Sequence, residues 1–210
     1  MTESSLLLST AYFPPVHYMA MAAGANKILI EKEENYIKQT YRNRCLILSP
    51  NGILTLSVPV LKGTFHKRDI KDIRIDYSRR WQQIHLRSII SSYRAAPFFE
   101  FYYERVENII LKGYNYLLDL NMASLEYLKE IIRIPAETGY TVEFTPVDNP
   151  DADPRYFINP KKPQLLSRFR FKQYIQVFSD RYGFVPGLST LDLIFNTGPD
   201  AGYYLPEINL

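Results

Sequence analysis

The chain has very little cysteine. Cys45 is the only one among its 210 residues. A disulfide needs two cysteines, so none can form within the chain, and zinc sites built from several cysteines are excluded as well. The sequence also lacks the Ser-His-Asp, metal-ligand and phosphate-loop patterns that would indicate a reaction type. We therefore expect no metal and no cofactor.

Long apolar runs are absent too. No stretch approaches the ~20 consecutive apolar residues that cross a bilayer. The opening segment, MTESSLLLSTAYF, has no basic region and too short an apolar run for a secretory signal. These absences predict a cytoplasmic protein without a membrane span.

The net charge of the chain is small, but one segment is strongly basic. The formal net charge is +3, which does not require a polyanionic partner and disfavours an RNA-binding module. Between Lys62 and Arg94, however, nine Lys or Arg residues accompany three Asp residues. A basic surface of that size can attract phosphate-bearing partners, although an ordinary solvated surface explains it equally well.

The clearest periodic pattern lies in residues 76–99, which we expect to form one amphipathic helix. Pro97 ends it, and Asp76 or Ser78 can cap its start. One face is predicted to be buried because its members follow the helical spacing of 3.6 residues. That face contains Trp81, Ile84, His85, Ile89 and Tyr93.

Two features of this helix suggest chemistry. His85 follows Trp81 by one turn, and burial beside an aromatic ring favours the neutral imidazole, which can act as a general base. The alternative is a core histidine satisfied by a backbone carbonyl. Arg80, Arg87 and Arg94 recur every seventh residue, forming a cationic stripe in which Arg87 and Arg94 have no acid three or four residues away. This stripe suits phosphate or carboxylate, or it is simply a solvated face.

The first third of the chain predicts an α/β fold, with α+β as the alternative. A strand over 6–10, a helix over 16–24 and a strand over 27–31 have the size of a βαβ unit. The loop Ala11 to His17 then lies at the carboxyl edge of a sheet, where α/β proteins bind ligands. Phe13, Pro15 and His17 also match part of a nucleotidylyltransferase pattern, but Met19 and Ala20 replace its phosphate-binding Gly and second His.

The next segments combine aromatic and basic side chains with a hairpin. Residues 36–44 place Tyr36, Asn43 and Arg44 in a set that can bind a ring and its anionic groups, or that forms a polar strand face. Asn51-Gly52 predicts a hairpin joining strands over 45–48 and 53–60. A basic loop, residues 62–67, precedes a strand expected over 70–75.

The rest of the chain is expected to pack on this body as one domain over 1–210. Two helices are predicted over 98–113 and 124–134, followed by a Pro-rich extended connection over 140–170. Order returns over 174–178, and Ser189 caps a short last helix over 190–195. This tail is expected to pack back on the body.

Taken together, the ordered motifs resemble the WbqC-like family. They are Tyr12-Phe13-Pro14-Pro15, residues 36–44 with Asn43-Arg44, Ser57-Val58-Pro59-Val60, Trp81 with His85, residues 93–99, and Pro186-Gly187-Leu188-Ser189-x-x-Asp192. The resemblance covers about residues 6–198. It differs where Thr10-Ala11 replaces the usual Gln-Pro opening and where residues 148–168 are shorter.

The resemblance implies a role in bacterial O-antigen polysaccharide biosynthesis, through transfer of a glycyl or similar acyl group to a surface sugar. In that hypothesis His85, or else His17, is the base. The expected substrate-binding residues are Tyr12, Tyr36, Asn43, Arg44, Trp81, Arg80 and Arg87. A sugar-linked or other small-molecule substrate is implied, and a charged tRNA is one candidate donor. A non-catalytic protein that binds a sugar nucleotide or phosphate ligand is the alternative.

Overall fold

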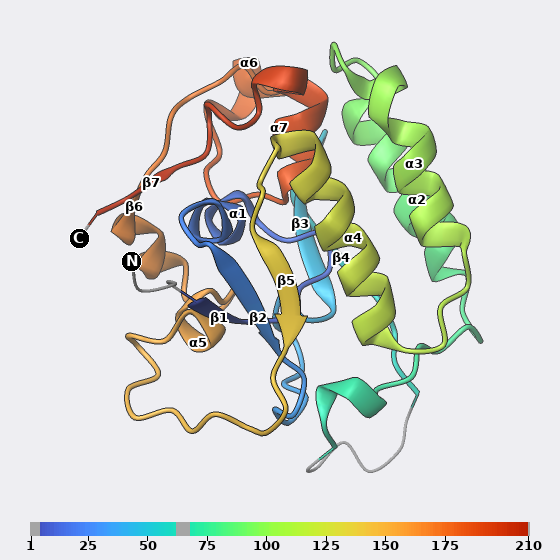
Figure 1. Cartoon of the computed structure of the whole chain (residues 1–210). Helices are drawn as coiled ribbons and strands as arrows, with labels where there is room; N and C mark the ends of the chain where they lie inside the picture. Colours follow the sequence, from blue (N-terminus) through green and yellow to red (C-terminus); the bar gives the residue numbers. More distant parts are fainter. Residues whose placement is uncertain (1–4, 62–67, 210) are drawn as a thin grey trace.

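A computed structural model of the chain describes residues 5–61 and 68–209. The elements mix helices and strands, as expected for an α/β or α+β protein (Figure 1). The basic loop predicted over residues 62–67 lies outside the described residues.

A three-stranded parallel sheet forms the first layer. Strands β1 (Ser5–Ser9) and β2 (Lys27–Glu31) pair in parallel, and helix α1 (Val16–Ala23) connects them. The predicted βαβ unit is therefore confirmed. The third strand, β5 (Glu137–Tyr140), pairs with β2 and was not predicted, because four residues of mixed polarity show no strand pattern.

The carboxyl edge of this sheet is filled by the protein's own buried ion pairs. Glu31, at the end of β2, pairs with Arg155 at 3.2 Å, and Glu34 pairs with Arg42 at 2.5 Å. All four side chains are almost completely buried. The loop from Ala11 to His17 lies at this edge, as predicted, but each of its residues is buried. The edge therefore has no open cleft along that loop.

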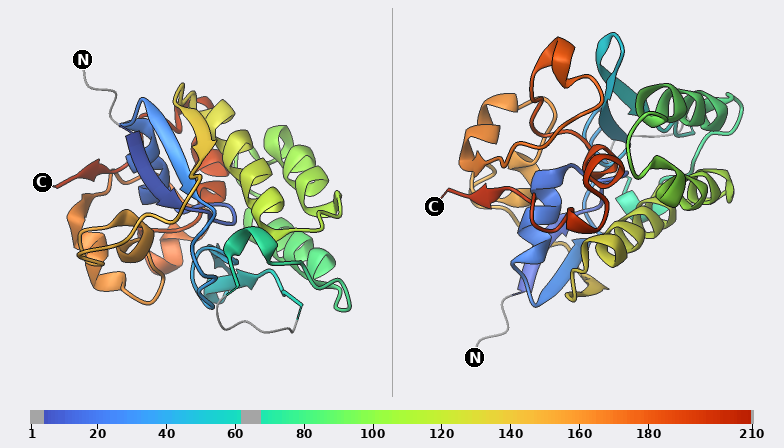
Figure 2. Two further views of the ribbon diagram at one scale, coloured as in Figure 1. Left: turned by 60° about the horizontal axis from the view of Figure 1, so that its bottom comes forward. Right: turned by 90° about the horizontal axis from the view of Figure 1, so that it is seen from above.

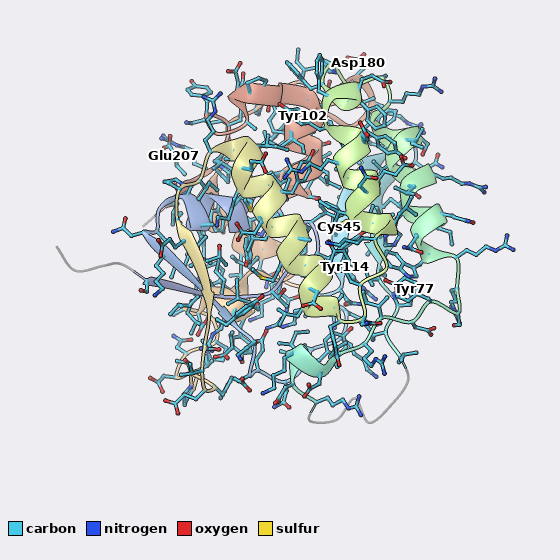
Figure 3. All side chains as sticks on the ribbon, turned by 45° about the vertical axis from the view of Figure 1, so that its right-hand side comes forward. Cys45, Tyr77, Tyr102, Tyr114, Asp180 and Glu207 are labelled. Atoms are coloured by element: carbon cyan, nitrogen blue, oxygen red, sulfur yellow. The ribbon has the colours of Figure 1, made fainter. Side chains whose placement is uncertain are left out.

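An antiparallel hairpin forms the second layer. Strand β3 (Arg44–Ser49) pairs with β4 (Gly52–Ser57), and the turn falls at the predicted place. Gly52 has a φ of 100°, a backbone conformation that favours glycine. Cys45, in β3, is free and lies in the interior (Figure 3).

Three helices cover this body. They are α2 (Trp81–Tyr93), α3 (Phe99–Leu111) and α4 (Leu117–Ile132). In Figures 1 and 2, α4 lies between the parallel sheet and the α2–α3 pair. The third helix begins seven residues earlier than predicted, because Leu117 and Leu120 extend its buried face.

Helix α2 is shorter than predicted, and its buried face is narrower. It begins at Trp81, with Arg80 as the N-cap and no side-chain cap, while the Asp76 carboxylate instead accepts a hydrogen bond from the Ser78 amide. Trp81 and His85 are buried as expected, but Ile84 is 60% exposed. The placement of Ile84 on the buried face was therefore wrong: its side chain lies at the edge of a pocket.

The strand predicted over residues 70–75 was also wrong. Residues Ile70–Asp72 form a 3₁₀ turn, η1, and only single bridges follow, from Arg74 to Tyr116 and from Ile75 to Val60. The pattern of Ile and charged residues reflects a segment with one buried side, because Ile70, Ile73 and Ile75 are all buried. A short turn with one buried side gives the same pattern as a strand.

The Pro-rich segment is mostly irregular, as predicted, and the tail packs on the body. Its short elements are α5 (Pro154–Phe157), η2 (Pro163–Arg168) and β6 (Phe169–Arg170). They are followed by α6 (Ser179–Tyr182), α7 (Thr190–Thr197), η3 (Gly198–Asp200) and β7 (Glu207–Ile208). The Ser189 hydroxyl accepts from the Leu191 amide and donates to the Phe13 carbonyl, so the predicted cap also ties α7 to the β1–α1 loop.

Candidate functional site

A pocket of about 580 Å³ lies between strand β4 and helix α2. Its volume is within the range of small-molecule sites. Three segments form its walls: the one before β3, the β4 strand with the residues after it, and the start of α2. The lining residues are Tyr36, Lys38, Gln39, Asn43, Arg44, Leu54, Thr55, Leu56, Ser57, Val58, Pro59, Val60, Asp76, Arg79, Trp81, Ile84, His85 and Ser88.

The hairpin register brings Asn43 and Arg44 to the end of β4. Arg44 pairs with Ser57, and the Asn43 side-chain amide donates to the Val58 carbonyl at 3.1 Å. Asn43 also receives a backbone hydrogen bond, from the Val58 amide to its carbonyl at 2.9 Å. The Asn43 side chain is therefore fixed against one wall of the pocket.

Three lining residues from different segments have buried polar atoms without a partner in the described part of the chain. These atoms are Oδ1 of Asn43, Nε of Arg44 and Nε1 of Trp81. A buried polar group usually has a hydrogen-bond partner, and each exception needs an explanation. Three such exceptions lie around this one pocket, which makes it the candidate site.

The lining is positively charged. It contains Lys38, Arg44 and Arg79 against one carboxylate, that of Asp76. Within residues 5–61 and 68–209, neither Arg44 nor Arg79 forms an ion pair with an acid. Burial raises the pKa of Tyr36 to about 12, although nearby Arg44 and Arg42 lower it. The Tyr36 hydroxyl is therefore protonated at neutral pH and can donate to an anion.

Aromatic rings form a second wall. The ring of Trp81 lies 5.0 Å from that of His85 and 5.9 Å from that of Tyr77, measured between centroids. The Tyr77 hydroxyl donates to the Tyr114 carbonyl, and the two residues lie close together in Figure 3. This contact holds the start of α2 against the α3–α4 connection. The rings of Tyr77 and His85 therefore both pack against the Trp81 indole.

His85 lies between the pocket and the core. Its Nδ1 is 3.0 Å from the Tyr12 hydroxyl. Burial lowers the His85 pKa to about 4, and a smaller effect of the Ser57 backbone acts in the opposite direction. Because burial also raises the Tyr12 pKa well above normal, the phenol keeps its proton. If the Tyr12 hydroxyl donates to Nδ1, the neutral ring carries its proton on Nε2.

The structure brings most, but not all, of the predicted site residues to this pocket. Tyr36, Asn43, Arg44, Trp81 and His85 line it. The other four expected residues do not, and they fall into two groups described next.

Tyr12 and His17 are buried behind the pocket. Tyr12 reaches it only through His85. His17 lies among Tyr41, Phe169 and Phe171, and burial lowers its pKa to about 3. The two histidines proposed as alternative bases are therefore not in the same pocket.

Arg80 and Arg87 are exposed on α2 outside the lining, together with Arg94. The cationic stripe is thus on the surface, as its spacing predicted. Arg79, which sequence reasoning missed, is the arginine of this segment that lines the pocket. Arg79 lies before the first residue of α2, so the helical spacing that selected Arg80, Arg87 and Arg94 does not include it.

Comparison with known proteins identifies the family. The model of the WbqC-like protein family matches residues 10–157, which include every residue of the pocket lining. The chain belongs to the WbqC-like family. This WbqC-like chain is also 25% identical over 226 residues to "Uncharacterized protein Rv1507c" of Mycobacterium tuberculosis (strain ATCC 25618 / H37Rv), a match covering 95% of this chain and 96% of the relative. No solved structure matches.

Two searches of the described residues found nothing. No group of three or more His, Cys, Asp or Glu side chains there is placed to hold a metal ion. None of the helices described is both long and apolar enough to cross a membrane.

Proposed function

We propose that the pocket between β4 and α2 binds a small anionic, sugar-linked substrate. The observation that carries this proposal is the set of unpartnered polar atoms on Asn43, Arg44 and Trp81 around one pocket. Arg44 and Arg79, which form no ion pair with an acid among the described residues, favour a phosphate or carboxylate on the ligand. Trp81 and His85, both buried, form the aromatic wall of the same pocket.

The reaction that family resemblance favours is transfer of a glycyl or similar acyl group to a sugar in polysaccharide biosynthesis, in the cytoplasm. In such a step the acceptor amine or hydroxyl gives its proton to a base and bonds to the acyl carbon, while the bond from that carbon to the leaving group breaks. The leaving group takes up the proton. His85 is the candidate base because it is neutral and lines the pocket.

A non-catalytic binding role is supported by a different observation. The tautomer in which Tyr12 donates to Nδ1 places the proton on Nε2, so that nitrogen can donate a hydrogen bond but cannot accept a proton. In this role His85 positions the ligand. Replacement of His85 by Gln distinguishes the two roles: a base predicts loss of turnover by ~10²–10⁴-fold with affinity retained, whereas a binding residue predicts loss of affinity.

Identification of ligands that copurify with the native protein tests the binding proposal. Mass spectrometry is applied to small molecules and RNA released from the wild type and from Asn43→Ala. The matched control is Asn121→Ala, since Asn121 is also buried with an unpartnered Oδ1 but does not line the pocket. The proposal expects an anionic sugar derivative in the wild type and control, and its loss from Asn43→Ala. Equal retention in all three proteins contradicts it.

A further inference from the structure

Strand β4 has one edge without a neighbouring strand. The described sheet that contains it has two strands, β3 and β4, and the register between them is continuous, without a bulge. Proteins usually protect such an edge with a charged side chain, a proline or a bulge, because its free backbone groups attract other strands. Strand β4 contains neither a charged residue nor a proline, and Ile53 is 60% exposed. The edge is therefore left open to a partner.

The hydrogen bonds of the hairpin show which backbone groups lie on this edge. Successive residues of an antiparallel pair direct their N–H and C=O groups alternately toward the partner strand and away from it. The Val58 amide bonds to the Asn43 carbonyl, so the β4 residues an odd number of positions before Val58 face away from β3. They are Ser57, Thr55 and Ile53. Thr55 and Ser57 line the pocket, so the edge forms part of its wall.

Ile53 and Thr55 have free backbone groups on this edge. Their amides and carbonyls have no hydrogen-bond partner within residues 5–61 and 68–209, and both residues are exposed. At the other end the edge is occupied, because the Ser57 backbone lies within hydrogen-bonding reach of His85. The open stretch from Ile53 to Thr55 thus presents two N–H and two C=O groups in one row.

An extended peptide is complementary to this row. Each residue of an extended peptide directs its own N–H and C=O to the same side, so one residue can exchange two hydrogen bonds with Thr55. The peptide residue two positions along does the same with Ile53. Addition of a peptide strand to a free sheet edge is a common mode of recognition. The spacing of the free groups therefore matches a strand of polypeptide.

Charge favours one kind of polypeptide. Arg44 stands directly opposite Ser57 in the hairpin register, so the two side chains lie on the same face. Arg44 and Arg79 line the pocket, and neither forms an ion pair with an acid among the described residues. A second copy of this chain would bring the same arginines toward each other, whereas Asp or Glu side chains would be attracted. The charges therefore favour an acidic occupant.

We propose that an extended, acidic peptide segment of a partner protein binds along Ile53–Thr55 as a third strand of the hairpin sheet. Its backbone pairs with that of β4, and its carboxylates interact with Arg44 and Arg79. This inference goes beyond the proposed function, because it requires no sugar. The two ligands share Arg44 and Arg79, so the peptide and a small anion compete.

Selection from a peptide library tests the inference. A library of random nine-residue peptides displayed on phage is selected against the full chain, and the enriched peptides are synthesised with blocked ends. We expect them to be rich in Asp or Glu. N-methylation of three consecutive backbone amides should weaken their binding at least about tenfold, the loss of one or two hydrogen bonds. Failure to enrich any peptide overturns the inference, and so does binding that survives N-methylation.

Two pairs of variants locate the bound peptide. Thr55→Pro removes an N–H that does not bond to β3, and proline is tolerated at such edge positions, whereas the control Thr55→Val keeps that N–H. Arg79→Gln removes a charge from the pocket lining, whereas the control Arg80→Gln removes one outside it. We expect weaker peptide binding in Thr55→Pro and Arg79→Gln alone. Equal binding by Thr55→Pro and Thr55→Val overturns the inference.

A measurement on the wild type does not depend on how the variants fold. Amide hydrogen exchange is compared at Ile53 and Thr55 with and without a saturating enriched peptide. The amides of Leu54 and Leu56 serve as internal controls, because they face β3. We expect the peptide to slow exchange at Ile53 and Thr55 at least about tenfold, and much less at the two controls. Unchanged exchange at Ile53 and Thr55 overturns the inference.

Two other results separate this inference from its alternatives. A concentration-dependent dimer of the wild type that Thr55→Pro abolishes would make a second copy the occupant, and it would overturn the acidic peptide. A sugar phosphate that shifts the Trp81 indole signal of a protein that binds no peptide overturns this inference but leaves the proposed function in place.

Discussion

The Tyr12 hydroxyl lies 3.0 Å from Nδ1 of His85, joining residues that are 73 positions apart in the chain. Tyr12 belongs to the loop after the first strand of the parallel sheet, whereas His85 lies on α2 at the pocket. This contact connects the loop after the parallel sheet's first strand to helix α2. Because it occupies Nδ1, the tautomer of the ring decides whether Nε2 can accept a proton.

The tautomer of His85 is the first prediction. With Tyr12 donating to Nδ1, ¹⁵N chemical shifts should show His85 protonated at Nε2 at neutral pH. Tyr12→Phe removes this donor, so we expect a mixture of tautomers and a loss of about 1 kcal/mol in the free energy of unfolding. A wild-type ring protonated at Nδ1 would contradict the assignment and favour His85 as a base.

The pH dependence of stability is the second prediction. Burial lowers the pKa of His85 to about 4 and that of His17 to about 3, from 6.5 in the unfolded chain. Between pH 6.5 and 4 the unfolded state therefore binds more protons, and stability falls as the pH falls, by up to about 1.4 kcal/mol per pH unit for each histidine. Buried Asp192 acts in the opposite direction, because its pKa is raised to about 6.

Urea unfolding at pH 7, 5.5 and 4.5 measures this slope. His17→Phe provides the comparison because Nδ1 of His17 has no hydrogen-bond partner in the described structure, so a phenyl ring replaces it without losing one. We expect the slope below pH 6.5 to be smaller in this variant by up to about 1.4 kcal/mol per pH unit, the contribution of one histidine. An unchanged slope would show that His17 does not stay neutral in the folded protein.

The buried pair of Glu31 and Arg155 is the third prediction. Both side chains are 1% exposed or less, so Arg155→Met leaves an uncompensated buried carboxylate. We expect a loss of about 3–5 kcal/mol in the free energy of unfolding. Adding Glu31→Gln should recover part of it because the remaining charge is removed. Strictly additive losses in the double variant would mean that the two residues are not coupled.

Sequence patterns predicted the parts of the fold that depend on local signals. The Asn51-Gly52 turn, the Ser189 cap and the helix from Val16 are all present, because turn chemistry, capping and periodicity act over a few residues. Strand β5 was missed because it forms by pairing with β2, whose residues are more than one hundred positions earlier in the chain. A local sequence pattern does not contain information on such a distant partner.

The candidate site was predicted in composition but not in geometry. Asn43 and Arg44 were recognised from an aromatic and basic stretch, and Trp81 with His85 from helical spacing. Their meeting depends on the hairpin register and on α2 packing against β3, which no single stretch encodes. His17 matched a motif, yet tertiary packing buried it among aromatic rings.

The arginine stripe of α2 gives the fourth prediction. If an aminoacylated tRNA is the donor, Arg80, Arg87 and Arg94 contact its phosphates. Replacing all three by Gln should then weaken RNA binding and reduce the slope of log K against log salt by about 2–3. Lys161→Gln, at an exposed site in the Pro-rich connection, is compared with Arg87→Gln as a single-charge control. Equal effects of these two changes would argue against a specific RNA surface.

The indole N–H of Trp81 provides the most direct test of ligand binding at the pocket. The chain has one tryptophan, so its ¹H–¹⁵N spectrum contains one indole signal, and the indole nitrogen has no hydrogen-bond partner in the described structure. Addition of N-acetylglucosamine 1-phosphate should shift this signal saturably in the wild type, and much less in Arg44→Gln. An indole signal that does not move at any concentration of sugar phosphate or sugar nucleotide would contradict a substrate site between β4 and α2.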